Sequence, residues 1–459
     1  MQRSRVSLFA FVLVVTICVF SEWASGQRKS SLAIKNVSLF DSLSGRMLKN
    51  RTILISGDRV RQVGTREKPV SIPDGTPVID GKGKYVIPGL IDAHVHLVHL
   101  SHFMHVTGDE FLPMFLAAGV TTVRSTGDPI VAQAGVANYA RARPNLCPRV
   151  FLASPLIDRY PPIHRDVGYS LTDPAKVPAF VADMARWNVV TLKIYAGLPP
   201  AVAKRVIEVG HKHGMKITAH LGAYTAQAAA ADGIDCFEHI ESVFNFCFPP
   251  GVRGTMTNRA NLDLRNPKCQ ALIKLLAKNK VAIDPTMVVF RNMLYLNDQK
   301  EYYDHPDVAL CPERMRKWWT QFGTSRRQSP KSLDVRRRMI GKYQQLTGML
   351  HKAGVPILVG TDAPEPFVPP GFSLHQEMEM LVGSGLTPAE VLQAATMNNA
   401  RILNQEKNLG SVTKGKLADL VILSADPTKN IKNTRKIVTI IRGGLRCNPK
   451  VVLSAVPRK

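Results

Sequence analysis

Ile87-Pro88-Gly89-Leu90-Ile91-Asp92-Ala93-His94-Val95-His96-Leu97 is the stretch that decides the fold, because it places two histidines one residue apart at the end of a hydrophobic run. In a β-strand, residues i and i+2 point to the same face, so His94 and His96 can offer two imidazoles to one metal ion. Two ligands do not yet make a site. Further nitrogen and oxygen ligands are needed at the ends of other strands.

Short β-rich runs alternate with helical patterns through the middle of the chain. Helical periodicity separates several of the runs, at residues 178–187, 201–213 and 268–278. Eight strands with intervening helices predict an α/β protein, a (β/α)8 TIM barrel over residues 88–407. A polar and aromatic stretch at about 290–335 is expected to insert over the barrel mouth between strands seven and eight. The eight predicted strands are residues 90–97, 120–125, 150–153, 191–195, 216–221, 236–240, 281–286 and 356–361.

The two ends of the sequence read as further strands. The turn Ser56-Gly57-Asp58 between two apolar runs favours a hairpin. Residues 418–423 and 437–444 look like strands near the other end. Neither end alone has enough strands to bury a face, so we expect residues 27–87 and 408–459 to form one small β-sandwich domain.

The first 26 residues predict an export signal. Arg3 and Arg5 precede the apolar run 6–20, and the small residues Ala24-Ser25-Gly26 offer a cleavage site. An uncleaved membrane anchor is the alternative, but about 15 apolar residues fall short of the roughly 20 that a span needs. We therefore expect a protein exported to a periplasmic or extracellular space, with no stable membrane span after cleavage.

The formal net charge of +25 is unusual for a chain of ordinary composition. Such a field could attract anionic surfaces, but the dense clusters Arg326-Arg327 and Arg336-Arg337-Arg338 lack a recognisable nucleic-acid module. No nucleic-acid partner is expected. Six cysteines follow the signal, none in a CxxC pair, so cysteine-ligated zinc is not predicted and disulfide pairing cannot be deduced.

In a TIM barrel, catalytic groups sit at the carboxyl ends of the strands. Metal-compatible residues end five of the predicted strands in this chain. They are His94 and His96 on strand one, Lys193 on strand four, His220 on strand five, Glu238-His239 on strand six, and Thr361-Asp362 on strand eight.

This ordered set resembles the amidohydrolase superfamily, in particular its imidazolonepropionase-like metal-dependent hydrolases and exported Xaa-Pro-dipeptidase-like enzymes. The resemblance covers essentially the whole mature chain. It rests on Pro-Gly-Leu-Ile-Asp-Ala-His-Val-His at 88–96, Leu192-Lys193-Ile194, Thr218-Ala219-His220, Phe237-Glu238-His239 and Gly360-Thr361-Asp362, and on two later stretches at 386–396 and 410–421.

The resemblance implies a centre with two divalent ions, zinc in the first instance. His94, His96 and Asp362 would hold one ion, and His220 and His239 the other. Lys193 would react with carbon dioxide to give a carbamate that bridges both, since two cations in proximity need an anionic ligand; the alternative is an ordinary lysine paired with an acid. A bridging hydroxide would attack a carbonyl, with Asp362 as base and acid, or as a ligand only.

Four residues are candidates for substrate binding. They follow strands three to five and could reach a carboxylate or carbonyl: His164, Arg165, Tyr195 and Tyr224. The family's frequent Arg-Asp pair after strand two reads Arg124-Ser125 in this chain, so that element is not transferred. The later histidines His99, His102 and His105 are left out of the core site.

The function predicted from these residues is hydrolysis of carbon–nitrogen bonds, amide or peptide, in small substrates such as dipeptides or N-acyl amino acids. A cyclic amidohydrolase is the enzymatic alternative. A non-catalytic protein that binds envelope polyanions through its positive charge is the alternative of another class. A homo-oligomer is compatible with the sequence.

Overall fold

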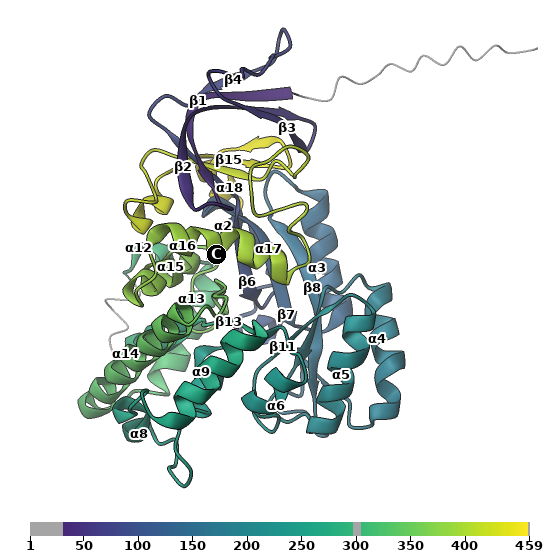
Figure 1. Ribbon diagram of the computed structural model, residues 1–459, viewed down its shortest axis with the longest axis vertical. Coiled ribbons are helices and arrows are strands. Elements are labelled where there is room, and N and C mark those ends of the chain that lie inside the picture. The colour runs from purple at the N-terminus through teal and green to yellow at the C-terminus, as the bar shows by residue number, and fades with distance from the viewer. Residues whose placement is uncertain (1–30, 297–303, 458–459) are drawn as a thin grey trace, which may run out of the picture.

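The computed structural model describes residues 31–296 and 304–457. The predicted export signal lies outside these ranges. Two sheets organise the described chain: a parallel sheet built from the middle of the sequence, and a mixed sheet built from both ends. In Figure 1 the mixed sheet lies at one end of the long axis, and the parallel sheet with its helices fills the rest.

The parallel sheet is a barrel whose eighth position is held by single bridges. Its strands follow the order β13-β12-β11-β10-β8-β7-β6, and β9 (Gly168–Ser170) pairs with β8 at the side. Parallel bridges Ile283 to Ile357 and Val95 to Ala363 place residues 357–363 between the two edge strands. The predicted TIM barrel is therefore confirmed. The strands are β6 (Leu90–Val95), β7 (Val120–Gly127), β8 (Arg149–Asp158), β10 (Thr191–Ile194), β11 (Lys216–Ala219), β12 (Cys236–Glu238) and β13 (Ala282–Asp284).

Helices follow the barrel strands and cover the outside of the sheet (Figure 1). The three helices predicted at 178–187, 201–213 and 268–278 are present as α4, α5 and α9. The bounds are α1 (Ser101–Met104), α2 (Gly108–Ala117), α3 (Ile130–Ala142), η1 (Pro174–Lys176), α4 (Val177–Arg186), α5 (Pro200–Lys212), α6 (Ala226–Ala231), α7 (Ile240–Asn245), α8 (Met256–Asn261), α9 (Pro267–Asn279), α15 (Phe372–Gly383), α16 (Pro388–Gln393), η3 (Ala394–Asn398) and α17 (Asn399–Ile402).

The stretch between β13 and the eighth position is largely helical. It starts with α10 (Met287–Asn292) and η2 (Met293–Leu296), and it continues after residue 303 with α12 (Pro306–Ala309), α13 (Glu313–Thr324) and α14 (Pro330–Lys352). The sequence predicted this insertion only as polar and aromatic. Ser329 caps α14 by accepting a hydrogen bond from the Ser332 amide, and Pro330 occupies the first helical turn, where its missing N–H costs nothing.

The mixed sheet joins the two ends of the chain, in the order β16-β15-β14-β5-β1-β2-β3 with β4 beside β1. The predicted hairpin is present: β2 and β3 are antiparallel, and Gly57 in the turn has a φ of 60° that suits glycine. The strands are β1 (Ser31–Asp41), β2 (Arg46–Ser56), β3 (Arg59–Gly64), β4 (Val78–Asp80), β5 (Tyr85–Pro88), β14 (Leu420–Leu423), β15 (Ile437–Arg442) and β16 (Leu445–Cys447), with η4 (Ile431–Arg435) and α18 (Pro449–Ser454) beside them.

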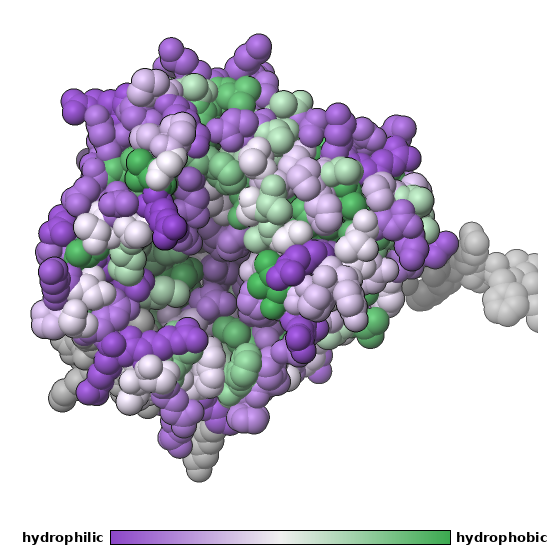
Figure 2. Space-filling model, turned by 90° about the horizontal axis from the view of Figure 1, so that it is seen from below, coloured by the Kyte–Doolittle hydropathy of each residue, from purple (hydrophilic) through white to green (hydrophobic). Residues whose placement is uncertain are grey.

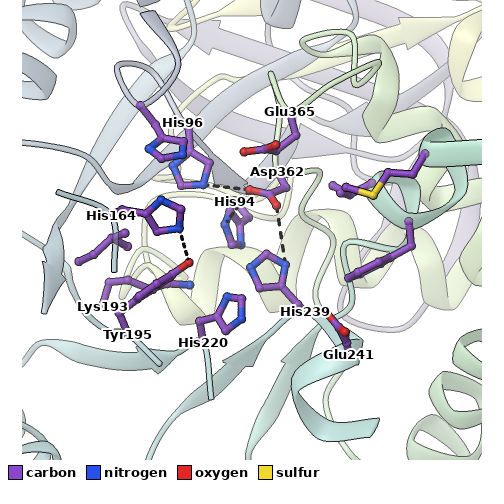
Figure 3. A pocket seen from close by; sticks show the side chains of 15 residues that line it. His94, His96, His164, Lys193, Tyr195, His220, His239, Glu241, Asp362 and Glu365 are labelled. Carbon is purple, nitrogen blue, oxygen red and sulfur yellow. Dashed lines mark hydrogen bonds and ion pairs between the residues drawn. The ribbon is translucent and has the colours of Figure 1, made fainter. Parts of the chain in front are cut away.

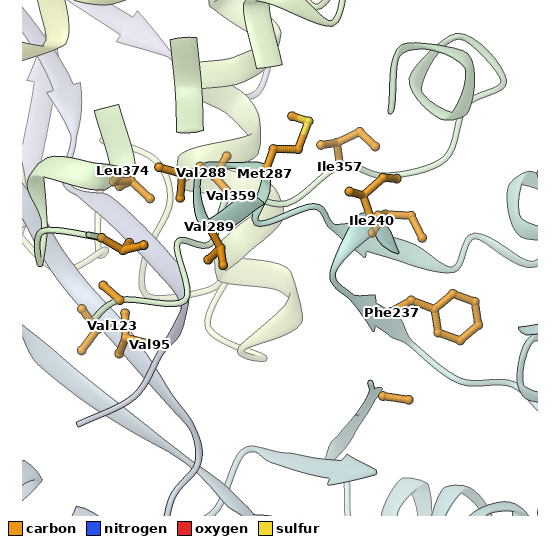
Figure 4. Close-up of a cluster of buried hydrophobic side chains, with 14 of the residues drawn as sticks. Val95, Val123, Phe237, Ile240, Met287, Val288, Val289, Ile357, Val359 and Leu374 are labelled. Atoms are coloured by element: carbon orange, nitrogen blue, oxygen red, sulfur yellow. The ribbon is translucent and has the colours of Figure 1, made fainter. Parts of the chain in front are cut away.

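Each sheet has its own hydrophobic core. The mixed sheet buries a cluster drawn from both chain ends, including Ile34, Ile53, Val86 and Ile422. The barrel core extends outward from the strands to the covering helices, and Figure 4 shows part of it around Val359. Within the described ranges, no helix combines the length and apolar character needed to cross a membrane.

Candidate metal centre

A pocket opens where the barrel strands end. The face turned away from the mixed sheet is hollowed near its centre (Figure 2). The cavity measures about 190 Å³. Figure 3 shows that its lining side chains point toward one another from many different strands. They are His94, His96, His99, Leu156, His164, Lys193, Tyr195, His220, His239, Glu241, Val289, Phe290, Met293, Asp362 and Glu365.

Asp362 is the point on which the first two histidines converge. Its Oδ1 lies 3.2 Å from Nε2 of His94 and 2.9 Å from Nε2 of His96. Burial alone would raise the pKa of Asp362, but the imidazoles of His94 and His239 outweigh it and hold that pKa well below its usual range. The carboxylate is therefore ionised at neutral pH. Nε2 of His94, Nε2 of His96 and Oδ1 of Asp362 thus face one position where the first and the eighth strand positions of the barrel meet.

His239 and His220 complete the histidine cluster. The ring centroid of His239 lies 4.8 Å from that of His94 and 4.8 Å from that of His220. Nδ1 of His239 contacts Oγ1 of Thr286 at 2.8 Å, which fixes the ring orientation. The cluster thus joins the ends of β6, β11 and β12 with the segment after residue 357.

The backbone is strained at these strand ends. His239, Thr286 and Asp362 have φ values of 65°, 44° and 63°, in the left-handed region that residues with a side chain seldom adopt. Threonine is especially unsuited to it because its Cβ is branched. Such conformations cost on the order of 1–3 kcal/mol each and persist where the surroundings hold them. They turn the chain sharply enough to aim the side chains of His239 and Asp362 into the pocket.

Below the histidines lies a fully buried group of charges. Glu238 accepts a hydrogen bond from Nη2 of Arg124 at 2.8 Å, and its other carboxylate oxygen lies 2.6 Å from Nδ1 of His94. Lys193 Nζ is 3.8 Å from Glu238. Burial alone would raise the pKa of Glu238, but Arg124, Lys193 and His94 together hold it well below its usual range. Glu238 therefore orients His94 and leaves Nε2 of that ring directed at Asp362.

Lys193 lines the pocket, and its side chain is buried up to the amine. Burial lowers the pKa of Lys193, and Glu238 only partly opposes this effect. Its Nζ makes no hydrogen bond within the described part of the chain. A buried amine of this kind is more readily neutral than a surface lysine, and Lys193 lines the pocket together with the histidines.

A second wall of the pocket is polar. Nε2 of His164 and the hydroxyl of Tyr195 lie 2.8 Å apart, and the ring of Tyr195 lies 5.0 Å from that of His220. His99 continues this wall, with its ring 5.2 Å from that of His164. Burial, with the nearby His96 and His164, lowers the pKa of His99 to about 3, so this ring is neutral at physiological pH.

Two residues predicted to bind substrate, Arg165 and Tyr224, lie outside the pocket lining. Tyr224 is buried, and its hydroxyl donates a hydrogen bond to Asp232 at 2.6 Å, away from the pocket lining. Arg165 is exposed and also absent from the lining. Both follow the expected strands in sequence, but the direction of a loop side chain is not fixed by that order.

Other residues of the pocket were not foreseen from the sequence. His99 was set aside, yet the Asp128 carboxylate accepts hydrogen bonds from the amides of Leu97 and His99, at 2.7 and 2.8 Å, and folds this loop back to the pocket. Glu241 and Glu365 also line it. Neither acid lies at a predicted strand end, so the sequence offered no signal for them.

The donor set fits a divalent metal ion. One ligand atom each from His94, His239 and Asp362 lies within 4.8 Å of the others, and His94 is almost completely buried. Imidazole nitrogen and carboxylate oxygen are the ligands that zinc and similar ions take in catalytic sites. The neutral state favoured for His220, whose pKa burial lowers to about 4, is the one that ligates metals.

Comparison with known proteins identifies the family. The sequence pattern of the Amidohydrolase family matches residues 85–446, most of the chain. The chain therefore belongs to the amidohydrolase family, and the resemblance drawn from its strand-end motifs is confirmed.

Relatives and solved structures are similar over different lengths. An imidazolonepropionase of Alkaliphilus metalliredigens is 22% identical over 83% of this chain and 85% of its own. An adenine deaminase of Staphylothermus marinus is 31% identical, but the match covers 28% of this chain and 22% of that protein. The crystal structure of a candidate prolidase from Bifidobacterium longum superimposes with a TM-score of 0.66 at 25% identity, over 94% of this chain and 99% of that one.

Proposed function

We propose that this protein is a metal-dependent hydrolase of amide or peptide bonds in small molecules such as dipeptides or N-acyl amino acids. One observation carries the proposal: Nε2 of His94 and Nε2 of His96 both lie within 3.2 Å of the same carboxylate oxygen of Asp362 in the pocket. The similarity to a candidate prolidase and to an imidazolonepropionase favours carbon–nitrogen bonds as the target.

The proposed ligand assignment is the one that the strand-end motifs imply. His94, His96 and Asp362 would hold one divalent ion, and His220 and His239 a second, with Lys193 as a bridging carbamate formed with carbon dioxide. Zinc is the first ion to test. When bound, such ions lower the pKa of a water molecule and polarise a carbonyl. Burial favours the neutral amine of Lys193, which is the form that reacts with carbon dioxide, and the carbamate would supply the negative charge that two neighbouring cations need.

Asp362 is suited to move the proton. As water adds to the substrate carbonyl carbon, the carboxylate of Asp362 accepts the proton, and it then gives that proton to the nitrogen that leaves. The strained backbone at Asp362 keeps the carboxylate at the pocket surface. The Tyr195 hydroxyl and the His164 ring, 2.8 Å apart, form a polar pair that would hold a carboxylate or carbonyl of the substrate on the far side of the scissile bond.

Pocket size and composition limit the substrate. A cavity of about 190 Å³ accommodates a small molecule and excludes a folded chain. Val289, Phe290 and Met293 add apolar side chains to the lining. The substrate would therefore carry a polar end and an apolar end, as a dipeptide or an acylated amino acid does.

Metal analysis coupled to an activity panel tests the proposal. Wild-type protein is expected to hold about two equivalents of zinc and to hydrolyse members of a panel of dipeptides and N-acyl amino acids. Lys193→Ala should lose at least one equivalent and most of the activity, whereas Lys212→Ala, an exposed lysine at the end of α5, should behave as wild type. Unchanged metal content in Lys193→Ala contradicts the bridging role.

Cyclic amides are the second candidate substrate class. The match to an imidazolonepropionase extends over most of both chains. A panel that includes small lactams and imidazolones separates the two readings, because a peptidase-like pocket would leave the cyclic substrates intact.

We also propose export from the cytoplasm, on the basis of the basic and apolar pattern in residues 1–26. N-terminal sequencing of the protein from its native compartment should find a chain that begins near Gln27.

A further inference from the structure

Two cysteines meet at the junction between α7 and α9. The Sγ atoms of Cys247 and Cys269 lie 2.7 Å apart, and both residues are fully buried. The two residues are 22 positions apart in the sequence, so the approach is produced by the fold and not by local chain geometry. Cys247 follows the end of α7, and Cys269 lies in the first turn of α9.

One side chain holds the two backbones in place. The amide nitrogen of Asn266 donates a hydrogen bond to the Cys247 carbonyl at 3.0 Å, and the amide oxygen of Asn266 accepts one from the Cys269 N–H at 3.0 Å. Asn266 is also the N-cap of α9. The two thiols are therefore brought together by an ordered hydrogen-bonded junction and not by a chance contact of mobile side chains.

The other described cysteines are engaged differently. The thiols of Cys236, Cys311 and Cys447 face the backbone carbonyl oxygens of Phe237, Asp307 and Leu445 at 3.4–3.7 Å. Cys147 is buried in the barrel core. Among cysteines of the described ranges, only Cys247 and Cys269 bring their sulfur atoms into contact.

We propose that Cys247 and Cys269 form a structural disulfide. The two thiols each lose a proton and together two electrons, and a bond forms between their sulfur atoms. A small-molecule or protein disulfide serves as oxidant and is reduced to two thiols, so the exchange is balanced. Because both sulfurs are buried, the exchange takes place before this part of the chain closes during folding.

The cross-link would fasten the segment next to the metal centre. Helix α7 leads from His239 at the strand end to Cys247, and Glu241 on that helix lines the pocket. The loop closed by the link includes Arg259, which pairs with Glu241. Closing this loop removes conformations from the unfolded chain. It also holds Arg259 beside Glu241 in the pocket lining. This inference does not depend on the substrate or metal of the proposed function.

Thiol counting on the full chain, purified without reductant, tests the link. In denaturant, the wild type is expected to gain two thiols on reduction, and a peptide map without reduction should contain one peptide pair that joins Cys247 to Cys269. Cys447→Ser, a matched loss of a cysteine that faces only a carbonyl, should still gain two. The double variant Cys247→Ser, Cys269→Ser should gain none.

Thermal unfolding supplies a second measurement. Reductant should lower the unfolding temperature of the wild type by roughly 3–4 °C and leave that of the double variant unchanged. Equal thiol counts before and after reduction, or a map that joins other cysteines, overturns the proposal. An intact link whose reduction leaves the unfolding temperature unchanged overturns its structural role. The wild-type map decides the pairing even where the serine variants fail to fold.

Discussion

Glu238 is the residue that connects the charges beneath the histidines. It contacts Arg124 and His94 directly and lies 3.8 Å from Lys193. A buried carboxylate that loses its positively charged partners destabilises the folded protein. Removal of one partner from a buried pair costs about 3–5 kcal/mol of folding free energy. The arrangement therefore makes the orientation of His94 dependent on a side chain that does not touch the substrate.

Replacement of Glu238 by glutamine should weaken metal binding by about 10–100-fold, because the amide no longer fixes the ring of His94 through a charged hydrogen bond. Competition with a chromogenic chelator measures the affinity. Glu208→Gln, an exposed glutamate that pairs with Arg205, is the control and should bind metal as the wild type does. If Glu238→Gln keeps a native circular dichroism spectrum and wild-type metal affinity, its orienting role is refuted.

The residue scale also shows where sequence reasoning ends. The histidines at 94 and 96 could be predicted as a pair because a strand places alternate residues on one face. His99 could not, because its position depends on Asp128, 29 residues away, whose carboxylate holds the loop after the strand. The direction of Tyr224 could not be predicted either, because its hydroxyl donates a hydrogen bond to Asp232, and the residue lies outside the pocket lining.

Among the elements, the segment at 357–363 is the least regular part of the barrel. It forms no regular ladder: single bridges lie at Ile357 and Ala363, and the amides of Leu358 and Asp362 donate to the carbonyls of Ile283 and His94, both at 2.8 Å. Side chains add to these contacts: Oγ1 of Thr361 donates to Asp92 at 2.7 Å, and Asn399 donates to the carbonyl of Val359 at 2.8 Å. The apolar run predicted this segment as a strand, whereas its irregularity comes from the turn that points Asp362 inward.

Gly360 leaves no room for a side chain within this segment. A methyl group there would lie 2.3 Å from Oδ2 of Asp284 and 2.6 Å from Cβ of His94. Gly360→Ala should therefore destabilise the protein by about 1–3 kcal/mol and displace His94, which lowers metal affinity as well. Chemical denaturation and the chelator titration measure the two effects.

Gly341 provides the matched control for that substitution. It lies in α14, and a methyl group there would meet nothing within 4 Å. Gly341→Ala should leave metal binding unchanged and raise stability by about 0.5–1 kcal/mol, because alanine loses less backbone freedom in a helix. If the two variants had the same free energy of unfolding, the residues around Gly360 would have to shift to accept the methyl group without loss of stability.

At the scale of the whole molecule, the mixed sheet unites strands that are more than 300 residues apart. The pairing of β5 with β14 joins Val86 to Ile422. The sequence predicted that the two ends meet, because neither could bury a face alone. It could not give the strand order, since β1 takes both an antiparallel and two parallel partners. The strand order of this sheet depends on contacts between residues far apart in the sequence, which only the complete fold brings together.

His375 links the barrel helices to the C-terminal region of the mixed sheet through two contacts, and its burial makes the stability of the protein depend on pH. From α15 it contacts the carbonyl of Ala118 after α2 at 3.0 Å and Oγ1 of Thr434 in η4 at 2.9 Å. Burial, with the nearby Arg435, lowers the pKa of His375 to about 3. The same histidine in the unfolded chain has a pKa of about 6.5. Between about pH 3 and pH 6.5, the unfolded chain therefore binds a proton at this position and the folded protein does not.

The sign of the effect follows from this difference. The unfolded state holds more protons below about pH 6.5, so the free energy of unfolding falls as the pH decreases through that range. Between pH 7 and 5.5, His375 should account for a loss of about 1 kcal/mol. Urea denaturation measures the free energy of unfolding at both pH values, and a chelator separates this effect from metal release. His375→Gln should lose less of that free energy than the wild type between pH 7 and 5.5, by about 1 kcal/mol, although the variant is less stable at pH 7. An identical pH dependence in the two proteins would mean that His375 accepts a proton in the folded state, through an opening of the contact between α15 and the carbonyl of Ala118.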